Sequence, residues 1–265
     1  MSLRGRIDSS EPTIGTFLNL GSPLAAEACA LAGFDWLLAD LEHGGGGEAA
    51  LVGQLMAGAM HGVPVLVRVE SAERIRPGRV LDLGAAGVMF PRLDTVEEVA
   101  AAIRHLRYPP EGDRGIATYN RACGFGLRSD ALETANDSVV GIVQIETVSA
   151  LENVEAIAQL PGVDVIFVGP LDLSHALGVP SQLESPEFRS ALIRVVAAAR
   201  AAEISAGILA RSNEAAQAYL EQGFAFIGVG SDSTFLATAA RQAAAPLVPM
   251  TGEPQVSDVG QALNN

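Results

Sequence analysis

The sequence predicts an α/β protein, a (β/α)8 TIM barrel in a single domain. Apolar strand-like runs alternate with Ala- and Leu-rich amphipathic stretches along most of the 265 residues, a pattern typical of βα units around a parallel sheet. Eight such pairs fit the chain without leaving enough residues for a second domain. A joint also recurs at Gly33, Gly162 and Gly223, where a glycine ends a helix just before a strand. A doubly wound open sheet is the lesser alternative, because no GxGxxG motif follows the first strand.

We expect strands where an apolar run lacks polar alternation, because a strand covered on both faces reads as one continuous apolar segment. Such runs occupy Ile14–Leu20, Trp36–Asp40, Val63–Val69, Gly87–Pro91, Gly141–Thr147, Val163–Val168, Ala206–Ala210 and Phe224–Val229. Amphipathic spacing places the helices at Pro23–Ala32, Glu48–Met60, Arg74–Leu83, Thr95–His105, Ala150–Gln159, Glu187–Ala202, Asn213–Glu221 and Asp232–Ala243. The long segment 107–132 remains irregular, and loops of this length in compact domains are usually functional.

The amino-acid composition limits which domain organisation and which binding partners are plausible for the chain. We expect residues 1–13 to form a polar leader, residues 14–245 the barrel, and residues 246–265 a weakly structured tail. Hydrophobic residues make up 49% of the chain and charged residues only 18%, which supports one large core. The net charge of −14 argues against nucleic acid or an anionic membrane as a partner. A small anionic substrate stays possible, because a few local arginines can hold one.

Cysteine and lysine usage narrows the chemistry. Cys29 and Cys123 belong to no CxxC motif and have no other zinc-ligand residues at a suitable spacing. We therefore expect both to be reduced thiols in a cytoplasmic protein. The first residues show no apolar signal region, and no apolar run is long enough to span a membrane. All 17 basic residues are arginine. The absence of lysine excludes a lysine Schiff base, a lysine general base and P-loop chemistry.

The carboxyl ends of the expected strands carry the residues with chemical potential. In a barrel these ends meet on one rim, where ligands bind. The second strand is followed by Asp40, Glu42 and His43, the third ends in Arg68, the fifth carries Gln144 and Glu146, and the sixth leads to Asp172. Neighbouring strands lie about 4.8 Å apart, so two of these carboxylates, Glu146 and Asp172, could share one cation. An all-oxygen pair favours Mg²⁺ or Mn²⁺. The alternative for Asp172 is a helix cap.

The other rim residues each allow two interpretations. His43 follows two acidic residues at a strand exit, which suits a general base, whereas a lone histidine elsewhere is more often solvated. Arg68 ends an apolar strand and needs an anionic partner, which is either a substrate or a structural carboxylate. The runs Gly44–Gly47 and Gly228–Ser233 could bind phosphate, or they could be a flexible loop and a helix cap.

Five motifs follow one another in the order of a known family. They are Gly33-Phe-Asp-Trp-Leu-Leu-Ala-Asp-Leu-Glu-His43, Pro64-Val-Leu-Val-Arg68, Arg107-Tyr-Pro-Pro-Glu-Gly-Asp-Arg-Gly115, Gln144-Ile-Glu146-Thr and Gly162-Val-Asp-Val-Ile-Phe-Val-Gly-Pro-Leu-Asp-Leu-Ser174. From about residue 14 to 240 the chain resembles the metal-dependent (class II) pyruvate aldolases, typified by 4-hydroxy-2-oxoheptanedioate aldolase and 2-dehydro-3-deoxyglucarate aldolase, of the aldolase/citrate lyase superfamily.

The resemblance implies a fold, an assembly and an ion. The family fold is a (β/α)8 barrel, assembled as a homo-oligomer (trimer or hexamer) in which the last helix is exchanged. By the resemblance, Glu146 and Asp172 bind a divalent metal, Mg²⁺ or Mn²⁺ and possibly Co²⁺.

Roles for the remaining rim residues follow from the same resemblance. It assigns enolate stabilisation to Arg68 and the base to His43. The keto-acid substrate would be held by Gln144 and by the backbone around Leu171 and Asp172. Two further aspartates would assist the base: Asp40 by orienting it, and Asp82 by raising its basicity, across a subunit contact. The chain departs from the family pattern at Leu41, at Gly44–Gly47 and at Leu171, which narrows the pocket beside the metal.

Together these observations predict a carbon–carbon lyase. It would cleave a 4-hydroxy-2-oxo acid, or a 2-keto-3-deoxy sugar acid, to pyruvate and an aldehyde. The lysine-free composition agrees, because the enolate then needs a metal ion as its electron sink. One alternative is a citrate-type or acyl-CoA condensing or lyase enzyme that uses the same site. Another is a non-catalytic 2-oxo-acid binding protein, which the intact set of charged residues disfavours.

Overall fold

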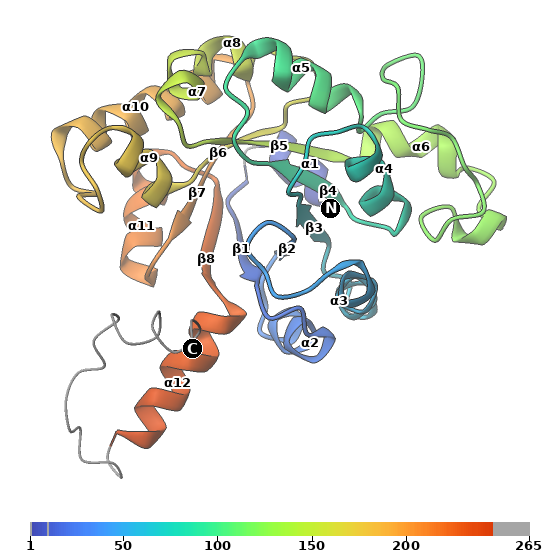
Figure 1. Cartoon of the computed structure of the whole chain (residues 1–265), viewed down its shortest axis with the longest axis horizontal. Helices are drawn as coiled ribbons and strands as arrows, with labels where there is room; N and C mark the ends of the chain where they lie inside the picture. The colour runs from blue at the N-terminus through green and yellow to red at the C-terminus, as the bar shows by residue number, and fades with distance from the viewer. Residues whose placement is uncertain (1, 10, 246–265) are drawn as a thin grey trace, which may run out of the picture. The chain divides into compact units, whose positions relative to one another are not determined.

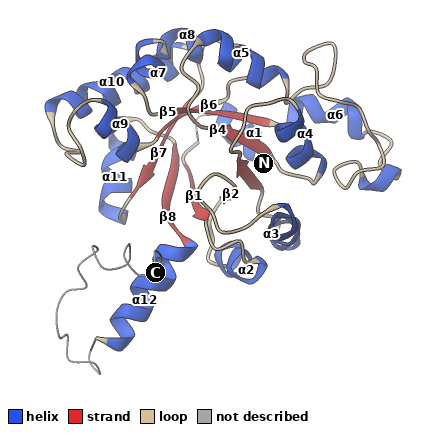
Figure 2. Cartoon of the chain, in the orientation of Figure 1, coloured by secondary structure: helices blue, strands red, loops and turns tan. Residues whose placement is uncertain are grey.

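The computed structural model describes residues 2–9 and 11–245, and within them eight parallel strands close into a barrel in the order β1 to β8, with β1 paired to β8. The expected (β/α)8 fold is therefore confirmed. Figure 2 shows the strands at the centre and helices outside them. The strands are β1 (Thr13–Leu18), β2 (Trp36–Asp40), β3 (Val65–Arg68), β4 (Gly87–Phe90), β5 (Val140–Ile145), β6 (Val165–Val168), β7 (Ser205–Ala210) and β8 (Phe226–Ser231).

The helices follow the expected alternation along the chain (Figure 1). They are α1 (Leu3–Asp8), α2 (Pro23–Leu31), α3 (Glu48–Met60), α4 (Ile75–Asp82), α5 (Val96–Arg104), α6 (Ala131–Ser138), α7 (Val148–Glu152), α8 (Val154–Ala158), α9 (Pro170–Ala176), α10 (Pro186–Ala201), α11 (Asn213–Gln222) and α12 (Asp232–Ala244), with a 3-10 turn at Gly124–Gly126. The helix expected at 150–159 is two short helices, because Asn153 leaves the helical conformation between them. Several unexpected helices, such as α1 and α9, are too short to show helical periodicity in sequence.

Two apolar layers stabilise the barrel. The outer layer lies between the strands and the surrounding helices, and the inner layer fills the barrel itself. Inside the barrel the rings of Trp36 and Phe226 stack with centroids 4.2 Å apart. Gly15 makes room for this stack, since a Cβ there would lie 2.0 Å from the Trp36 ring. The barrel is thus a packed core, and ligands must bind at its ends.

Helix α1 lies within the segment expected to be a polar leader. Its apolar side chains Leu3 and Ile7 are buried and join the inner layer of the barrel. Arg4 forms an ion pair with the buried Asp164, just before β6, at 3.0 Å. Arg6 forms another with Asp35, just before β2, at 2.5 Å. The helix therefore covers the amino-terminal end of the barrel.

The chain divides into two compact units, residues 1–232 and 233–265. The described part of the second unit, residues 233–245, consists of most of α12 and one further residue. The tail expected at 246–265 lies outside the described residues. No helix in the described part of the chain is long and apolar enough to cross a membrane.

The strand register brings the rim residues together at the carboxyl end. Asp40 on β2 is paired with Arg68 on β3. On the far side, Ile145 on β5 is paired with Val168 on β6, so the residues that follow them, Glu146 and Gly169, are also neighbours. The predicted rim residues therefore come from two pairs of adjacent strands of one barrel, β2 with β3 and β5 with β6.

Candidate active site at the carboxyl ends of the strands

A buried ion pair between Asp40 and Arg68 lies at the centre of the rim. The Nε and Nη2 atoms of Arg68 donate to the two carboxylate oxygens of Asp40, at 2.9 and 2.7 Å. The side chain of Asp40 is 0% exposed and that of Arg68 11%. Bidentate pairing of this kind fixes the plane of the guanidinium as well as its position. The structural carboxylate expected as one option for Arg68 is therefore Asp40.

Asp40 also accepts hydrogen bonds from two neighbouring loops. The side-chain amide of Asn19, just after β1, donates to Oδ2 at 2.8 Å. The main-chain N–H groups of Glu42 and His43 donate to Oδ1 at 3.1 and 3.2 Å. Burial alone would raise the pKa of Asp40, but the hydrogen bonds and charge of Arg68, together with these N–H groups, hold it below the ordinary value of 3.8. Asp40 is therefore an anion that ties together the ends of three strands.

The remaining edge of the Arg68 guanidinium faces the rim. Nη1 lies 3.2 Å from a carboxylate oxygen of Glu42 and 3.4 Å from the side-chain oxygen of Gln144. The guanidinium also lies over the ring of Phe17, 5.4 Å from its centroid. Because Nε and Nη2 are committed to Asp40, Nη1 is the part of Arg68 that can face a bound anion.

Glu146 is the buried carboxylate on the opposite side of the rim. It is 5% exposed. One oxygen accepts from the main-chain N–H of Arg92 at 2.9 Å, and the other accepts from the side-chain amide of Gln144 at 2.8 Å. Burial raises the pKa of Glu146, and the negative charge of Asp172 raises it further. The negative charge of Asp172 therefore lies close enough to Glu146 to disfavour ionisation of the Glu146 carboxylate.

The loop after β6 presents Leu171 and Asp172 in the first turn of α9. Both residues are exposed, Leu171 by 42%. Gly169, at the start of this loop, lies against the opposite carboxylate: a Cβ there would be 3.0 Å from Oε2 of Glu146 and 3.3 Å from the amide nitrogen of Gln144. A side chain at position 169 would therefore press on the Glu146 carboxylate.

The two carboxylates suit a divalent cation. A buried carboxylate whose pKa is raised by a neighbouring anion is stabilised when a cation lies between the two. Both groups offer oxygen ligands, which Mg²⁺ and Mn²⁺ prefer. Within residues 2–9 and 11–245 no cluster of three or more His, Cys, Asp or Glu side chains could hold a metal ion. An ion held by Glu146 and Asp172 would therefore need further ligands from water or substrate.

His43 lies at the mouth of the rim, with its side chain 67% exposed. Its Nε2 atom is 3.7 Å from a carboxylate oxygen of Glu42. The family resemblance implies Asp40 as the orienting carboxylate, but in the structure Asp40 accepts the main-chain N–H of His43 and does not contact its ring. The acidic group nearest the imidazole is Glu42, so Asp40 orients the histidine only through its backbone.

Asp82, the other predicted aspartate, takes part in a different contact. It is the last residue of α4 and accepts a hydrogen bond from the buried guanidinium of Arg114 at 2.7 Å. Within the described residues of one chain, no contact joins Asp82 to His43. Its predicted role stays a prediction that requires a neighbouring subunit.

Backbone packing accounts for the glycine runs. A Cβ on Gly44 would lie 2.1 Å from the carbonyl oxygen of Asp40, and one on Gly46 would lie 2.7 Å from the Cα of Gly21. The N–H of Gly45 donates to the carbonyl of Asn19 at 2.8 Å. In the second run, the carboxylate of Asp232 accepts the N–H of Asn19, at 2.7 Å, where a phosphate would face its negative charge. These contacts favour the structural interpretation of both runs.

Three residues in this network were not among the predicted site residues. The first expected strand, Ile14–Leu20, includes Asn19, whereas β1 ends at Leu18 and leaves the asparagine on the rim. Glu42 is expected on the rim without a role of its own, yet it contacts both His43 and Arg68. Arg92 contributes through its main-chain N–H. The strand-end rule could have found the first two, but no side-chain pattern identifies a main-chain donor.

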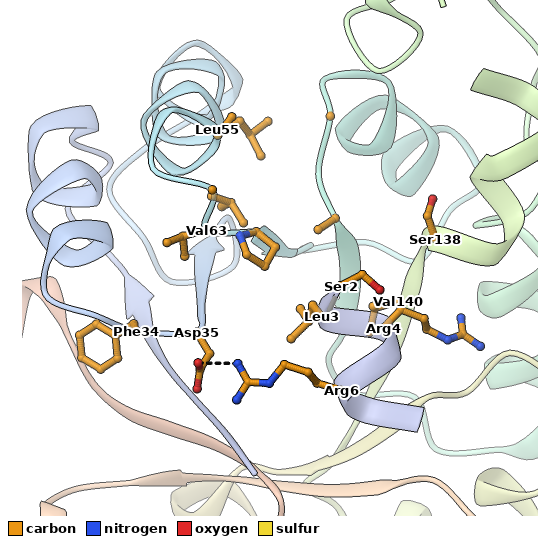
Figure 3. Close-up of a pocket in the computed structure, with 16 residues that line it drawn as sticks. Ser2, Leu3, Arg4, Arg6, Phe34, Asp35, Leu55, Val63, Ser138 and Val140 are labelled. Atoms are coloured by element: carbon orange, nitrogen blue, oxygen red, sulfur yellow. Dashed lines mark hydrogen bonds and ion pairs between the residues drawn. The ribbon is translucent and has the colours of Figure 1, made fainter. Parts of the chain in front are cut away.

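A cavity of about 600 Å³ lies at the other end of the barrel, beside α1 (Figure 3). Its charged groups are already paired, Arg6 with Asp35 and Arg4 with Asp164. The rim at the carboxyl ends has the uncompensated carboxylates and the exposed histidine, so we place the site there.

A parallel barrel that gathers carboxylates, an arginine and a histidine at the carboxyl ends of its strands has the arrangement of a barrel enzyme. Residues 13–239 match the family model described as HpcH/HpaI aldolase/citrate lyase. The hydroxypyruvate/pyruvate aldolase of Paraburkholderia phytofirmans is 42% identical, over 91% of this chain and 95% of that protein. The 4-hydroxy-2-oxovalerate aldolase of Rhodococcus jostii is 39% identical, over 89% and 92%.

A solved structure of a member of the same family is also similar to this chain. The structure of a HpcH/HpaI aldolase/citrate lyase family protein from Burkholderia cenocepacia J2315 has a TM-score of 0.88 and 41% identity, over 92% of this chain and 98% of that one. The chain belongs to the HpcH/HpaI aldolase/citrate lyase family. The resemblance predicted from the five sequence motifs is confirmed.

Replacing Gly169 with alanine should weaken binding of a divalent ion at this rim. The new methyl group would meet the Glu146 carboxylate at 3.0 Å and displace it. We expect Mn²⁺ affinity, measured by calorimetry, to fall by roughly tenfold, the scale of changes to groups that orient metal ligands. Gly78→Ala is the control, because a Cβ on that helical glycine meets nothing within 4 Å. Unchanged affinity in Gly169→Ala would contradict this account of the site.

Proposed function

We propose that the protein is a class II, divalent-metal-dependent aldolase. It would cleave a 4-hydroxy-2-oxo acid, or a 2-keto-3-deoxy sugar acid, reversibly to pyruvate and an aldehyde. The observation that carries the proposal is the buried carboxylate of Glu146, whose ionisation the negative charge of Asp172 disfavours, on the same rim as the fixed guanidinium of Arg68. Family membership and the names of the aldolase relatives support it.

The chain's own residues suggest how such a reaction would run. Glu146 and Asp172 would hold the ion, which when bound polarises the ketone of the 2-oxo acid. His43, exposed at the mouth, would take the proton of the 4-hydroxyl group as the C3–C4 bond breaks and the aldehyde forms. Nη1 of Arg68 would face the negative charge of the pyruvate enolate. Protonation of that enolate at C3 completes the formation of pyruvate.

Gln144 would link the proposed metal ligand Glu146 to Arg68, the residue that would face the enolate. Its amide donates to Glu146 and its oxygen lies beside Arg68, so its orientation is set from both sides. We propose that it binds the keto-acid together with the backbone around Leu171 and Asp172. The exposed Leu171 side chain, next to Asp172 in the first turn of α9, would limit the size of the aldehyde half.

The assembly that we propose is a homo-oligomer, either a trimer or a hexamer. The long segment before β5 supports it, because Tyr119, Phe125 and Leu127 are exposed there at 71% or more. The same segment carries Arg114, the partner of Asp82. A neighbouring copy on this surface would give Asp82 its route to a second subunit's histidine.

Citrate-type or acyl-CoA chemistry is the second candidate, and the family description, which includes citrate lyase, favours it. An acyl-CoA substrate carries several phosphates and would need a basic surface, whereas the chain has a net charge of −14. A non-catalytic 2-oxo-acid binder is the third candidate. It would have no use for the exposed imidazole of His43.

Pyruvate release is the direct test of the proposed reaction. Metal-stripped protein should release no pyruvate from a panel of 4-hydroxy-2-oxo acids, and Mg²⁺ or Mn²⁺ should restore release. His43→Ala should lower turnover by at least a hundredfold, since positioned general bases contribute about 10²–10⁴-fold, while it retains 2-oxo-acid binding. Activity that survives exhaustive chelation would exclude the metal-dependent mechanism, and cleavage of a citrate or acyl-CoA substrate instead would select the second candidate.

Metal binding should depend on pH through Glu146. Its pKa is raised above 4.5 by burial and by Asp172, so its carboxylate becomes protonated at a higher pH than an ordinary glutamate. Metal ligands must be deprotonated, so Mn²⁺ affinity should fall as the pH drops through this window above 4.5, by about tenfold per pH unit for one proton. Calorimetry across the acid range measures it. Affinity that stays constant down to pH 4.5 would contradict the assignment of Glu146 as a ligand.

A further inference from the structure

Arg92 has an uncommon backbone conformation at the rim. It lies two residues beyond the end of β4, and its φ of +52° is in the left-handed region, which L side chains adopt at a cost. Its main-chain N–H donates to Oε1 of Glu146 at 2.9 Å. Strained backbone that persists at a site is held there by its surroundings and often contributes to function.

The loop that contains Arg92 is fastened to the segment that follows Glu146. The carbonyl of Asp94 accepts from the hydroxyl of Ser149 at 3.2 Å and from the amide of Asn153 at 3.0 Å. The carboxylate of Asp94 accepts from the hydroxyl of Thr147. Leu93, between Arg92 and Asp94, is buried. The left-handed turn is therefore fixed against the strand end that presents Glu146.

The side chain of Arg92 does not explain its conformation. It is exposed, and among the described residues its guanidinium has no hydrogen bond or ion pair. By contrast, Arg68 on the neighbouring strand is held by Asp40 and Glu42. What Arg92 contributes to the rim is its main-chain N–H.

We propose that Arg92 is a positioning residue for Glu146 and acts through its backbone. The left-handed turn directs the N–H at Oε1, while Gln144 holds Oε2, so the carboxylate is fixed in plane and rotation. A carboxylate oriented in this way binds a divalent ion without losing freedom at the moment of binding. The inference rests on the proposed metal-dependent function, because the group being positioned is the proposed ligand.

The test replaces Arg92 with residues that differ in how readily they adopt a positive φ. The Mn²⁺ affinity of each metal-stripped variant is measured by calorimetry, without substrate. Arg92→Gly, which adopts positive φ freely, should bind Mn²⁺ within about twofold of the wild type. Arg92→Val, which disfavours positive φ most, should bind at least tenfold more weakly. Arg92→Ala should lie between them, and it keeps the test decisive if the valine variant does not fold.

Glu203 offers a matched control at the other end of the barrel. It has a φ of +56° just before β7 and no contact with the rim. Glu203→Val should lower the melting temperature as Arg92→Val does but leave Mn²⁺ affinity unchanged. Equal affinity in wild type and Arg92→Val, or Arg92→Ala if valine does not fold, would overturn the inference. So would an equal loss in Arg92→Gly, which would assign the role to the guanidinium. A wild type that binds no Mn²⁺ would instead overturn the proposed function itself.

Discussion

The buried ion pair between Asp40 and Arg68 is the constraint on which the rest of the site depends. A buried charge without a partner is costly, and removing one member of such a pair typically destabilises a protein by about 3–5 kcal/mol. Here Asp40 accepts from side chains on two neighbouring strand ends and from the backbone of its own loop. The Asp40 carboxylate therefore fixes the orientation of the Arg68 guanidinium and the position of the His43 backbone.

Charge is distributed unequally around the rim as a result. The positive charge of Arg68 is largely compensated by Asp40 and Glu42. On the far side, burial and the negative charge of Asp172 raise the pKa of Glu146. On one side of the rim the carboxylates thus have the chain's own arginine as a counter-charge, while Glu146 and Asp172 on the other side would be stabilised by an added cation. This asymmetry is the physical reason for proposing an ion at Glu146 and Asp172 rather than elsewhere.

Much of this site could be predicted from sequence, because an apolar run followed by a charged residue marks the carboxyl end of a buried strand. That rule places Arg68, Glu146 and Asp172 on one rim, and the closed barrel of eight parallel strands is as expected. In the structure Glu42 lies nearest the His43 ring and Asp40 accepts the main-chain N–H of His43, a distinction that sequence similarity does not make. Helix α1 is too short to show helical periodicity in the sequence, and no side-chain pattern indicates the left-handed turn at Arg92.

The central claim is that Asp40 and Arg68 organise catalysis without themselves holding the ion, and Asp40→Asn tests it most directly. Asparagine keeps the size of the side chain but removes the charge that holds Arg68 and the second acceptor oxygen. We predict turnover at least a hundredfold lower, with Mn²⁺ affinity within a few-fold of the wild type, because Glu146 and Asp172 are retained. A folded Asp40→Asn variant that releases pyruvate at the wild-type rate would contradict the account.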